Sequence, residues 1–250
     1  MPLIQTPSFQ IACYIQGDQD AQKLAIVVPG KLDTKDYLHM RSHVDFLAQK
    51  GYLALSFDPP GTWESPGDIT LYNMSNNLVA IEELIEYFGN KPTFVLGHSR
   101  GGSMAMLAGI RLPQVSHFGV IMSYPSFDPQ IHGGYPDEEW RHKGYRVSQR
   151  DIPNTDPVEY REFKLPYSFL EDQIKYDMRE GLSQCEKLKM FIYGDQDDKV
   201  KPELVKMAYD LSAEPKFLYG LHSGHDYRKY PQLITEVNNS IEDFLEKIEK

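Results

Sequence analysis

A glycine-flanked serine between an apolar run and a helical pattern constrains this chain more than any other feature. Residues 94–96 are Phe-Val-Leu, residues 97–101 are Gly-His-Ser-Arg-Gly, and a pattern typical of a helix follows. In a Gly-x-Ser-x-Gly motif the serine lies on a tight strand-to-helix turn, the nucleophile elbow, and the glycines leave room where a Cβ would meet backbone. The helix start offers free N–H groups and a positive dipole end. This context predicts that Ser99 is a nucleophile; the alternative is a glycine-rich turn with a bystander serine.

Apolar runs alternate with helical patterns along most of the chain. Strands that alternate with helices indicate βαβ units and a mostly parallel sheet. Residues 9–15 alternate loosely before a Gly-Asp turn, which indicates an N-terminal hairpin. Further strands are expected at residues 24–28, 52–57, 93–96, 118–122, 188–193 and 216–219, and helices at residues 36–49, 74–88, 99–112, 203–211 and 233–248.

This alternation breaks between residues 124 and 184. The segment is rich in proline, tyrosine, aspartate and arginine, and only residues 167–179 have a convincing helical pattern. A plain connection of this length is uncommon in a compact domain. We therefore expect a single domain over residues 1–250, with a cap or lid inserted at about 124–184 over one end of the sheet.

The composition is that of a soluble globular protein, with 41% hydrophobic and 25% charged residues. A net charge of −10 argues against nucleic acid or an anionic membrane as a general partner. Cys13 and Cys185 have neither a disulfide framework nor metal-ligand spacing, so we expect free thiols and no metal. No signal peptide or membrane-spanning run is recognisable. We expect a cytoplasmic protein without a cofactor, either a monomer or a homodimer.

Polar residues suited to nucleophilic catalysis follow three of the predicted strands. Ser99 follows one strand, Asp195, Asp197 and Asp198 follow another, and His225 lies in the loop after the last. Catalytic groups in an open parallel sheet collect where the strands end. A histidine can remove the serine proton, and a carboxylate can orient the imidazole and stabilise its charged form. The chain order serine, aspartate, histidine is that of one known triad fold.

At these motifs the chain resembles the α/β-hydrolase family, and within it the small esterases near the cinnamoyl (feruloyl) esterases and monoacylglycerol lipases. The resemblance covers nearly the whole chain outside the expected cap. It implies a mostly parallel central sheet with helices on both faces and an inserted cap. The motifs that carry it are Pro29-Gly30-Lys31, Asp58-x-x-Gly61-x-x-x-Ser65, Gly97-His98-Ser99-Arg100-Gly101 and Gly224-His225.

The resemblance also ranks the candidate catalytic residues. Asp197 is favoured over the two other aspartates because its distance from Gly194 and the position of Val200 match the family pattern. His225 is favoured over His222 because it directly follows a glycine. The catalytic residues implied are therefore Ser99, Asp197 and His225.

The oxyanion hole needs two backbone N–H groups that point at the tetrahedral oxygen. The family pattern implies those of Lys31 and Arg100, although Pro29 stands where a histidine is usual, so Leu32 remains an alternative donor. The side chains of Lys31 and Arg100 are both cationic. They could recognise an anionic group of the substrate, or they could point into solvent.

The remaining candidate residues have two interpretations each. His98 is expected to be a structural hydrogen-bonding residue beneath the turn, and His132 and His142 either contact the substrate or are simply solvated. Aromatic residues of the expected cap form either a wall of the substrate site or a small core of the cap. The candidates for substrate binding are Gly30, Tyr124, Trp140 and Tyr167, with Tyr145 and Phe169 as further aromatic residues.

Together these patterns predict a serine hydrolase that cleaves a carboxylic ester or thioester of a small to medium acyl substrate through an acyl-enzyme. The same triad would serve a peptidase of the serine-aminopeptidase type or a C–C bond hydrolase. A non-catalytic binding module on this fold is a third possibility, which the loss of a triad member would support. No such loss is visible in the sequence.

Overall fold

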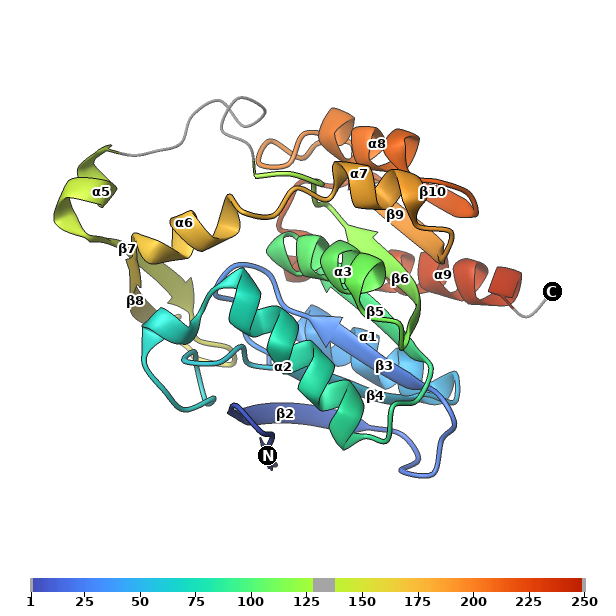
Figure 1. Cartoon of the computed structure of the whole chain (residues 1–250), viewed down its shortest axis with the longest axis horizontal. Helices are drawn as coiled ribbons and strands as arrows, with labels where there is room; N and C mark the ends of the chain where they lie inside the picture. Colours follow the sequence, from blue (N-terminus) through green and yellow to red (C-terminus); the bar gives the residue numbers. More distant parts are fainter. Residues whose placement is uncertain (1, 128–137, 249–250) are drawn as a thin grey trace.

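The computed structural model describes residues 2–127 and 138–248. Its described strands form a sheet in the order β1-β2-β4-β3-β5-β6-β9-β10, with helices on both faces (Figure 1). The strands of this sheet are β1 (Leu3–Gln5), β2 (Gln10–Gln16), β3 (Leu24–Val28), β4 (Leu53–Phe57), β5 (Thr93–His98), β6 (Val115–Ile121), β9 (Leu188–Gly194) and β10 (Lys216–Leu221).

The six neighbouring strands β4, β3, β5, β6, β9 and β10 are parallel, as the alternating pattern predicted. Every residue of β3, β4 and β5 is buried, which explains why these strands are continuous apolar runs. The antiparallel hairpin lies one strand earlier than expected. It joins β1 to β2. After Gly17 and Asp18 the chain continues to β3, and β2 pairs with β4 instead of β3.

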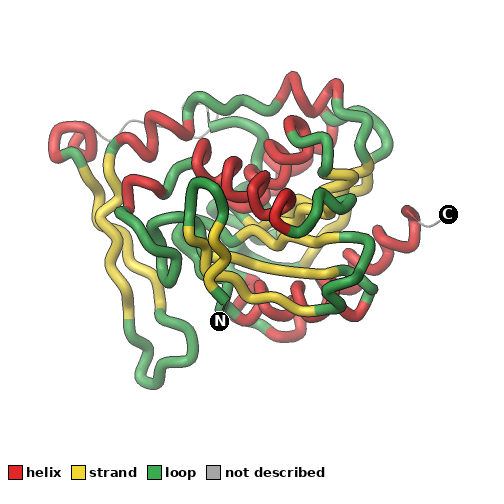
Figure 2. The backbone as a smooth tube through the Cα atoms, turned by 60° about the horizontal axis from the view of Figure 1, so that its bottom comes forward, coloured by secondary structure: helices red, strands yellow, loops and turns green. Residues whose placement is uncertain are grey.

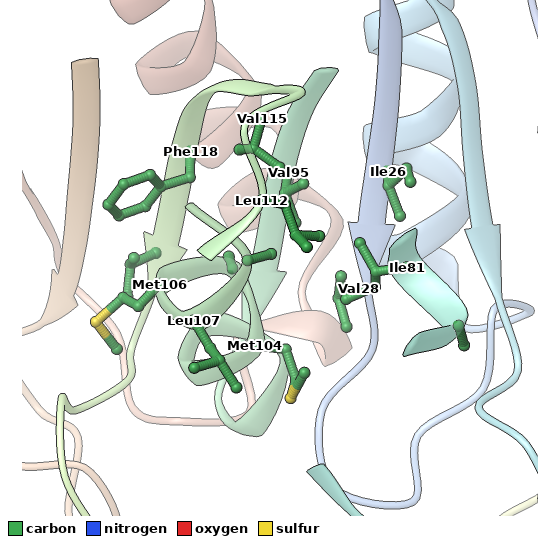
Figure 3. Packing of buried hydrophobic residues seen from close by; sticks show 14 of the residues in the cluster. Ile26, Val28, Ile81, Val95, Met104, Met106, Leu107, Leu112, Val115 and Phe118 are labelled. Carbon is green, nitrogen blue, oxygen red and sulfur yellow. The ribbon is translucent and has the colours of Figure 1, made fainter. Parts of the chain in front are cut away.

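Two layers of helices bury the two faces of the sheet, as Figure 2 shows. Helices α1 (Leu38–Gln49) and α9 (Pro231–Ile248) cover one face through a cluster that includes Val44 and Phe244. The other cluster, shown in Figure 3, includes Ile81, Met104 and Val95. The helices on that face are α2 (Met74–Tyr87), α3 (Arg100–Arg111), α7 (Arg179–Gln184) and α8 (Pro202–Leu211). Among the described helices, none is long and apolar enough to cross a bilayer.

Residues 138–173 of the region expected to be a cap lie at the left of Figure 1, whereas α7, at the end of that region, packs near α3 and α8. We call residues 138–173 the inserted segment. It contains α5 (Glu138–Lys143), an antiparallel hairpin of β7 (Tyr145–Asp151) and β8 (Tyr160–Pro166), and α6 (Ser168–Gln173). The expected helix over residues 167–179 is wrong as a continuous element. It divides into α6 and α7, because between them the chain turns and Asp177 forms a bridge with Ser126.

The inserted segment has a small core of its own that it shares with the loops of the main sheet. Trp140 and Phe169 stack with their ring centroids 6.2 Å apart, and Phe169 also stacks on Tyr72 at 5.4 Å. Tyr72 directly follows the short helix η1 (Ile69–Leu71). This core therefore joins the inserted segment to the loops at the carboxyl ends of the strands. Its buried members are Leu32, Tyr72, Trp140, Phe163, Leu165, Phe169 and Leu170.

Candidate active site

Ser99 lies in a sharp turn between β5 and α3. Its backbone has φ 55° and ψ −124°, a left-handed conformation that costs energy for a non-glycine residue. A Cβ on Gly97 would lie 2.0 Å from the carbonyl oxygen of Gly101, and a Cβ on Gly101 would lie 2.1 Å from that of Val28. Only glycine fits at these two positions, so the spacing of the motif follows from the close approach of the backbone.

Three side chains from three strand ends form one hydrogen-bonded chain. The Nε2 atom of His225 lies 2.9 Å from the Oγ atom of Ser99, and its Nδ1 atom lies 2.7 Å from Asp197 Oδ2. The other carboxylate oxygen of Asp197 accepts the backbone N–H groups of Lys199 and Val200 at 2.9 and 2.8 Å. The Asp197 carboxylate is therefore fixed by its own loop and holds the imidazole toward the serine.

The competing residues lie elsewhere. His222 and Asp195 form an exposed pair at 2.8 Å, Asp198 is exposed, and none of the three lines the cavity next to Ser99. His98 is buried behind the turn, where its Nε2 atom bonds the carbonyl oxygen of His225 at 3.2 Å. Burial lowers the pKa of His98 well below its ordinary value, so its ring is neutral. His142 is exposed on α5, and His132 lies outside the described residues.

The two residues predicted to donate to an oxyanion both line the cavity that Ser99 lines. The backbone N–H groups of Lys31 and Arg100 have no acceptor within residues 2–127 and 138–248. The N–H group of the alternative donor, Leu32, is already used, because it donates to the Oη atom of Tyr72 at 2.8 Å. This geometry favours Lys31 over Leu32.

The peptide between Lys31 and Leu32 and the peptide after it are held by side chains from distant parts of the chain. Arg150 of β7 donates Nε–H and Nη2–H to the carbonyl oxygen of Lys31 at 2.8 and 2.6 Å. Trp63 donates its indole N–H to the carbonyl oxygen of Leu32 at 2.8 Å. With the bond from Tyr72, these contacts fix the loop before any substrate binds, which is what preorganised oxyanion stabilisation requires.

A cavity of about 430 Å³ opens above Ser99 and His225. Of the residues predicted to bind substrate, Tyr124 and Trp140 line this cavity. Tyr167 is half-buried against Trp140 outside the lining, and Gly30 is buried beside Asp33. Further lining residues are Phe127, Phe169, Leu170, Gln173 and the side chains of Lys31 and Arg100.

Four supporting residues of this site were not predicted: Trp63, Tyr72, Arg150 and Gln173. None occupies a specified position of a motif, and each reaches the site only through its tertiary position. The sequence signals were weak: Trp63 lies within the Asp58–Ser65 loop motif, and Tyr72 precedes a helix start. Arg150 lies in a strand of exposed and half-buried residues without an apolar pattern, so nothing local indicates that it reaches the oxyanion loop.

Two groups of side chains have potential metal-ligand atoms within 4.8 Å of one another in the described part of the chain. Asp33, His39 and His98 form the first, but the Nε atom of Arg150 lies 3.2 Å from Asp33, and its positive charge disfavours a cation. The ammonium group of Lys35 already occupies the second group, at 2.7, 3.1 and 2.6 Å from oxygens of Asp36, Asp58 and Glu64. Neither group is a strong candidate for a metal centre.

A family model described as serine aminopeptidase, S33, matches residues 19–166 of the chain. No curated protein sequence matches this chain. Solved structures are similar over nearly the whole chain. Est1E from Butyrivibrio proteoclasticus, with ferulic acid bound, has 18% identity, a TM-score of 0.78 and 100% of both chains covered.

Two further solved structures show the same fold. The esterase Pf2001 from Pyrococcus furiosus has 18% identity and a TM-score of 0.70, with 98% of this chain and 91% of that chain covered. A thioesterase domain from the curacin biosynthetic pathway has 15% identity and a TM-score of 0.71, with 96% and 98% covered. At these identities the similarity concerns the fold, and the predicted α/β-hydrolase fold is confirmed.

Proposed function

The chain belongs to the serine aminopeptidase S33 family of α/β-hydrolases and is a serine hydrolase, and we propose that it cleaves small to medium carboxylic esters or thioesters through an acyl-enzyme. The observation that carries this proposal is the hydrogen-bonded chain from Ser99 through His225 to Asp197, which opens on the cavity. The esterase and thioesterase among the similar structures support the same class of bond.

In the proposed first step, Ser99 Oγ attacks the carbonyl carbon while His225 Nε2 takes its proton. The buried carboxylate of Asp197 stabilises the imidazolium that forms. The N–H groups of Lys31 and Arg100 bind the oxyanion of the tetrahedral intermediate. His225 then gives the proton to the leaving alcohol or thiol, and the acyl group stays on Ser99.

In the second step, water attacks the acyl-enzyme while His225 takes a proton from it. Collapse of the second tetrahedral intermediate releases the acid and returns the proton to Ser99. We propose that the inserted segment acts as a cap that selects the substrate by shape, because Trp140, Phe169 and Leu170 form one wall of the cavity.

Replacing Ser99 with alanine tests the proposal. We expect Ser99→Ala to lower hydrolysis of p-nitrophenyl butyrate by about a thousandfold or more, because the nucleophile is lost. The matched control is Ser103→Ala, whose hydroxyl also borders the cavity but bonds Ser123 at 2.8 Å instead of a histidine. Ser103→Ala should keep most of the activity. Equal activity of wild type and Ser99→Ala would contradict the proposal.

The family description makes an aminopeptidase the second candidate. Recognition of a peptide N-terminus requires free carboxylates near the nucleophile. The carboxylates that line this cavity are paired with cations: Asp33 with Arg150, Asp151 with Arg228, and Asp226 with Lys199. This charge distribution favours an ester or thioester. Faster cleavage of aminoacyl p-nitroanilides than of p-nitrophenyl butyrate would instead support the peptidase.

A further inference from the structure

We propose that the side chains of Lys31 and Arg100 form a subsite for a carboxylate on the substrate. The enzyme would then prefer esters or thioesters in which a carboxylate lies a few bonds from the scissile carbonyl. This inference rests on the proposed function and specifies its substrate class. It extends the roles of these two residues from their backbone N–H groups to their side chains.

Arg100 is buried, with 6% of its surface exposed, yet its guanidinium is only partly satisfied. Nη1–H donates to the Oε1 atom of Gln173 at 2.7 Å, whereas Nε and Nη2 have no hydrogen-bond acceptor in the described part of the chain. The rings of Phe169 and Tyr72 lie 4.4 and 5.1 Å from the guanidinium carbon and offer no acceptor. These two nitrogens are buried and unpartnered. The edge that they form is one of the two guanidinium edges that bind a carboxylate with two parallel hydrogen bonds.

Lys31 brings a second unneutralised charge to the same place. Its Nζ atom lies 5.5 Å from the centre of the Phe169 ring, on which Arg100 also packs, and 5.9 Å from that of Trp140. Within the described residues, no carboxylate oxygen lies within 4.0 Å of this ammonium group. Burial, with a smaller contribution from the nearby charges of Arg150, Arg146 and Arg100, lowers the pKa of Lys31 to about 8.

The lack of an acidic partner for Lys31 and Arg100 does not follow from a shortage of carboxylates. The chain has 36 acidic and 26 basic residues, so carboxylates are not scarce. Of the other cations that line the cavity, Arg150 pairs with Asp33 and Arg228 with Asp151. Arg146 and Lys229 also line it and have no carboxylate within 4.0 Å in the described part of the chain, but neither is as deeply buried as Arg100. Leaving a buried guanidinium without an anion is costly unless a ligand supplies it. Because both side chains start at the proposed oxyanion donors, the bound carboxylate must lie close to the reacting carbonyl.

Matched pairs of esters test the subsite. Monoethyl adipate carries a carboxylate where ethyl 6-methylheptanoate carries an isopropyl group of the same shape. A second pair, 3-acetoxybenzoate and phenyl acetate, places the carboxylate on the leaving group instead. We expect kcat/KM of wild type to favour the anionic member of at least one pair by about tenfold to a hundredfold, the range for hydrogen bonds to charged groups. The pair whose anionic member is preferred shows whether the subsite binds a carboxylate on the acyl group or on the leaving group.

Side-chain variants then test which residue causes the preference for the anionic ester. Arg100→Met and Lys31→Met keep the backbone N–H groups, so the ratio within a pair isolates the side chain. We expect Arg100→Met to bring the ratio close to one and Lys31→Met to lower it severalfold. Arg111→Met removes a guanidinium from the other end of α3, where it packs on Tyr176, and should leave the ratio unchanged.

Equal kcat/KM values within both pairs for wild type would overturn the subsite, whatever the variants do. Ser99-dependent hydrolysis of p-nitrophenyl butyrate in that same experiment would leave the proposed function intact. Hydrolysis of none of these esters would overturn both. A wild-type preference that survives in Arg100→Met and in Lys31→Met would also contradict the assignment.

Discussion

Tyr72 shows how a single hydroxyl group can prepare the oxyanion site. It is buried, and its Oη atom accepts the N–H group of Leu32, the residue after the proposed donor Lys31. Its ring supports Phe169 and the guanidinium of Arg100. The hydroxyl therefore orients a peptide next to the reacting carbonyl without touching the substrate, which makes Tyr72 a positioning residue.

We expect Tyr72→Phe to lower kcat about tenfold with little change in KM. The ring stays, and only the hydrogen bond that holds the N–H group of Leu32 is lost. This decrease in kcat is smaller than the hundredfold or more that removal of an oxyanion donor itself costs. The measurement is steady-state hydrolysis of p-nitrophenyl butyrate. Tyr219→Phe is the control, since the hydroxyl of Tyr219 bonds Asp243 on α9. A change confined to KM would contradict the positioning role.

The sequence predicted a serine, an aspartate and a histidine that each follow a strand and occur in a known order, and the family resemblance selected Asp197 and His225 among the candidates. The structure brings the side chains of Ser99, Asp197 and His225 together. The residues that support the oxyanion loop were not predictable in the same way. Their contacts cross long sequence separations, and no local pattern specifies which arginine or tyrosine makes them.

At the scale of elements, α6 is attached to α2 by one buried carboxylate. Asp172 of α6 accepts the backbone N–H groups of Met74 and Ser75 at 2.8 and 3.0 Å, at the start of α2. It also accepts the Ser75 hydroxyl at 2.5 Å. An anionic acceptor at a helix N-terminus satisfies free donors and interacts favourably with the helix dipole. This contact also places the next residue, Gln173, beside Arg100.

We expect Asp172→Ala to lower the free energy of unfolding by about 1–3 kcal/mol, because buried backbone donors lose a charged acceptor. Urea unfolding provides the measurement. The control is Asp68→Ala, which removes an exposed carboxylate that accepts the backbone N–H group of Thr70 at the start of η1. This substitution should lower the free energy of unfolding by less. The account of α6 docking fails if Asp172→Ala costs no more than the control.

Among the elements, those of the inserted segment were the ones that the sequence did not predict. The side chains of β7 are mostly exposed or half-buried, so the strand lacks the apolar alternation that identified β2. The interruption between α6 and α7 also has no local signal, because it depends on the bridge from Asp177 to Ser126. In contrast, the strands of the central sheet were predictable because burial on both faces requires continuous apolar runs.

At the scale of the whole molecule, buried histidines connect stability to pH. Burial lowers the pKa of His43 to about 4, and it does the same for His117. His43 is held neutral between Asn238 and Tyr227, at 2.6 and 2.8 Å. In the unfolded chain both imidazoles take up protons near their ordinary pKa of about 6.5. The unfolded state therefore binds more protons between about pH 6.5 and pH 4.

We expect the free energy of unfolding to fall as pH decreases through this window, by on the order of 1–3 kcal/mol per pH unit. Urea unfolding at pH 7.5, 6 and 5 measures the slope. His117→Gln should reduce it, whereas His142→Gln, at an exposed position of α5, should not. A stability that is constant from pH 7.5 to pH 5 would contradict this linkage.

The central claim is that Ser99 is the nucleophile, activated by His225. The most direct measurement is peptide mapping by mass spectrometry after reaction with a fluorophosphonate probe, which forms a stable adduct with an activated serine. The account predicts one adduct per chain, on Ser99, absent from Ser99→Ala and formed far more slowly in His225→Ala. An adduct on another residue, or labelling of Ser99→Ala at the wild-type rate, would contradict it.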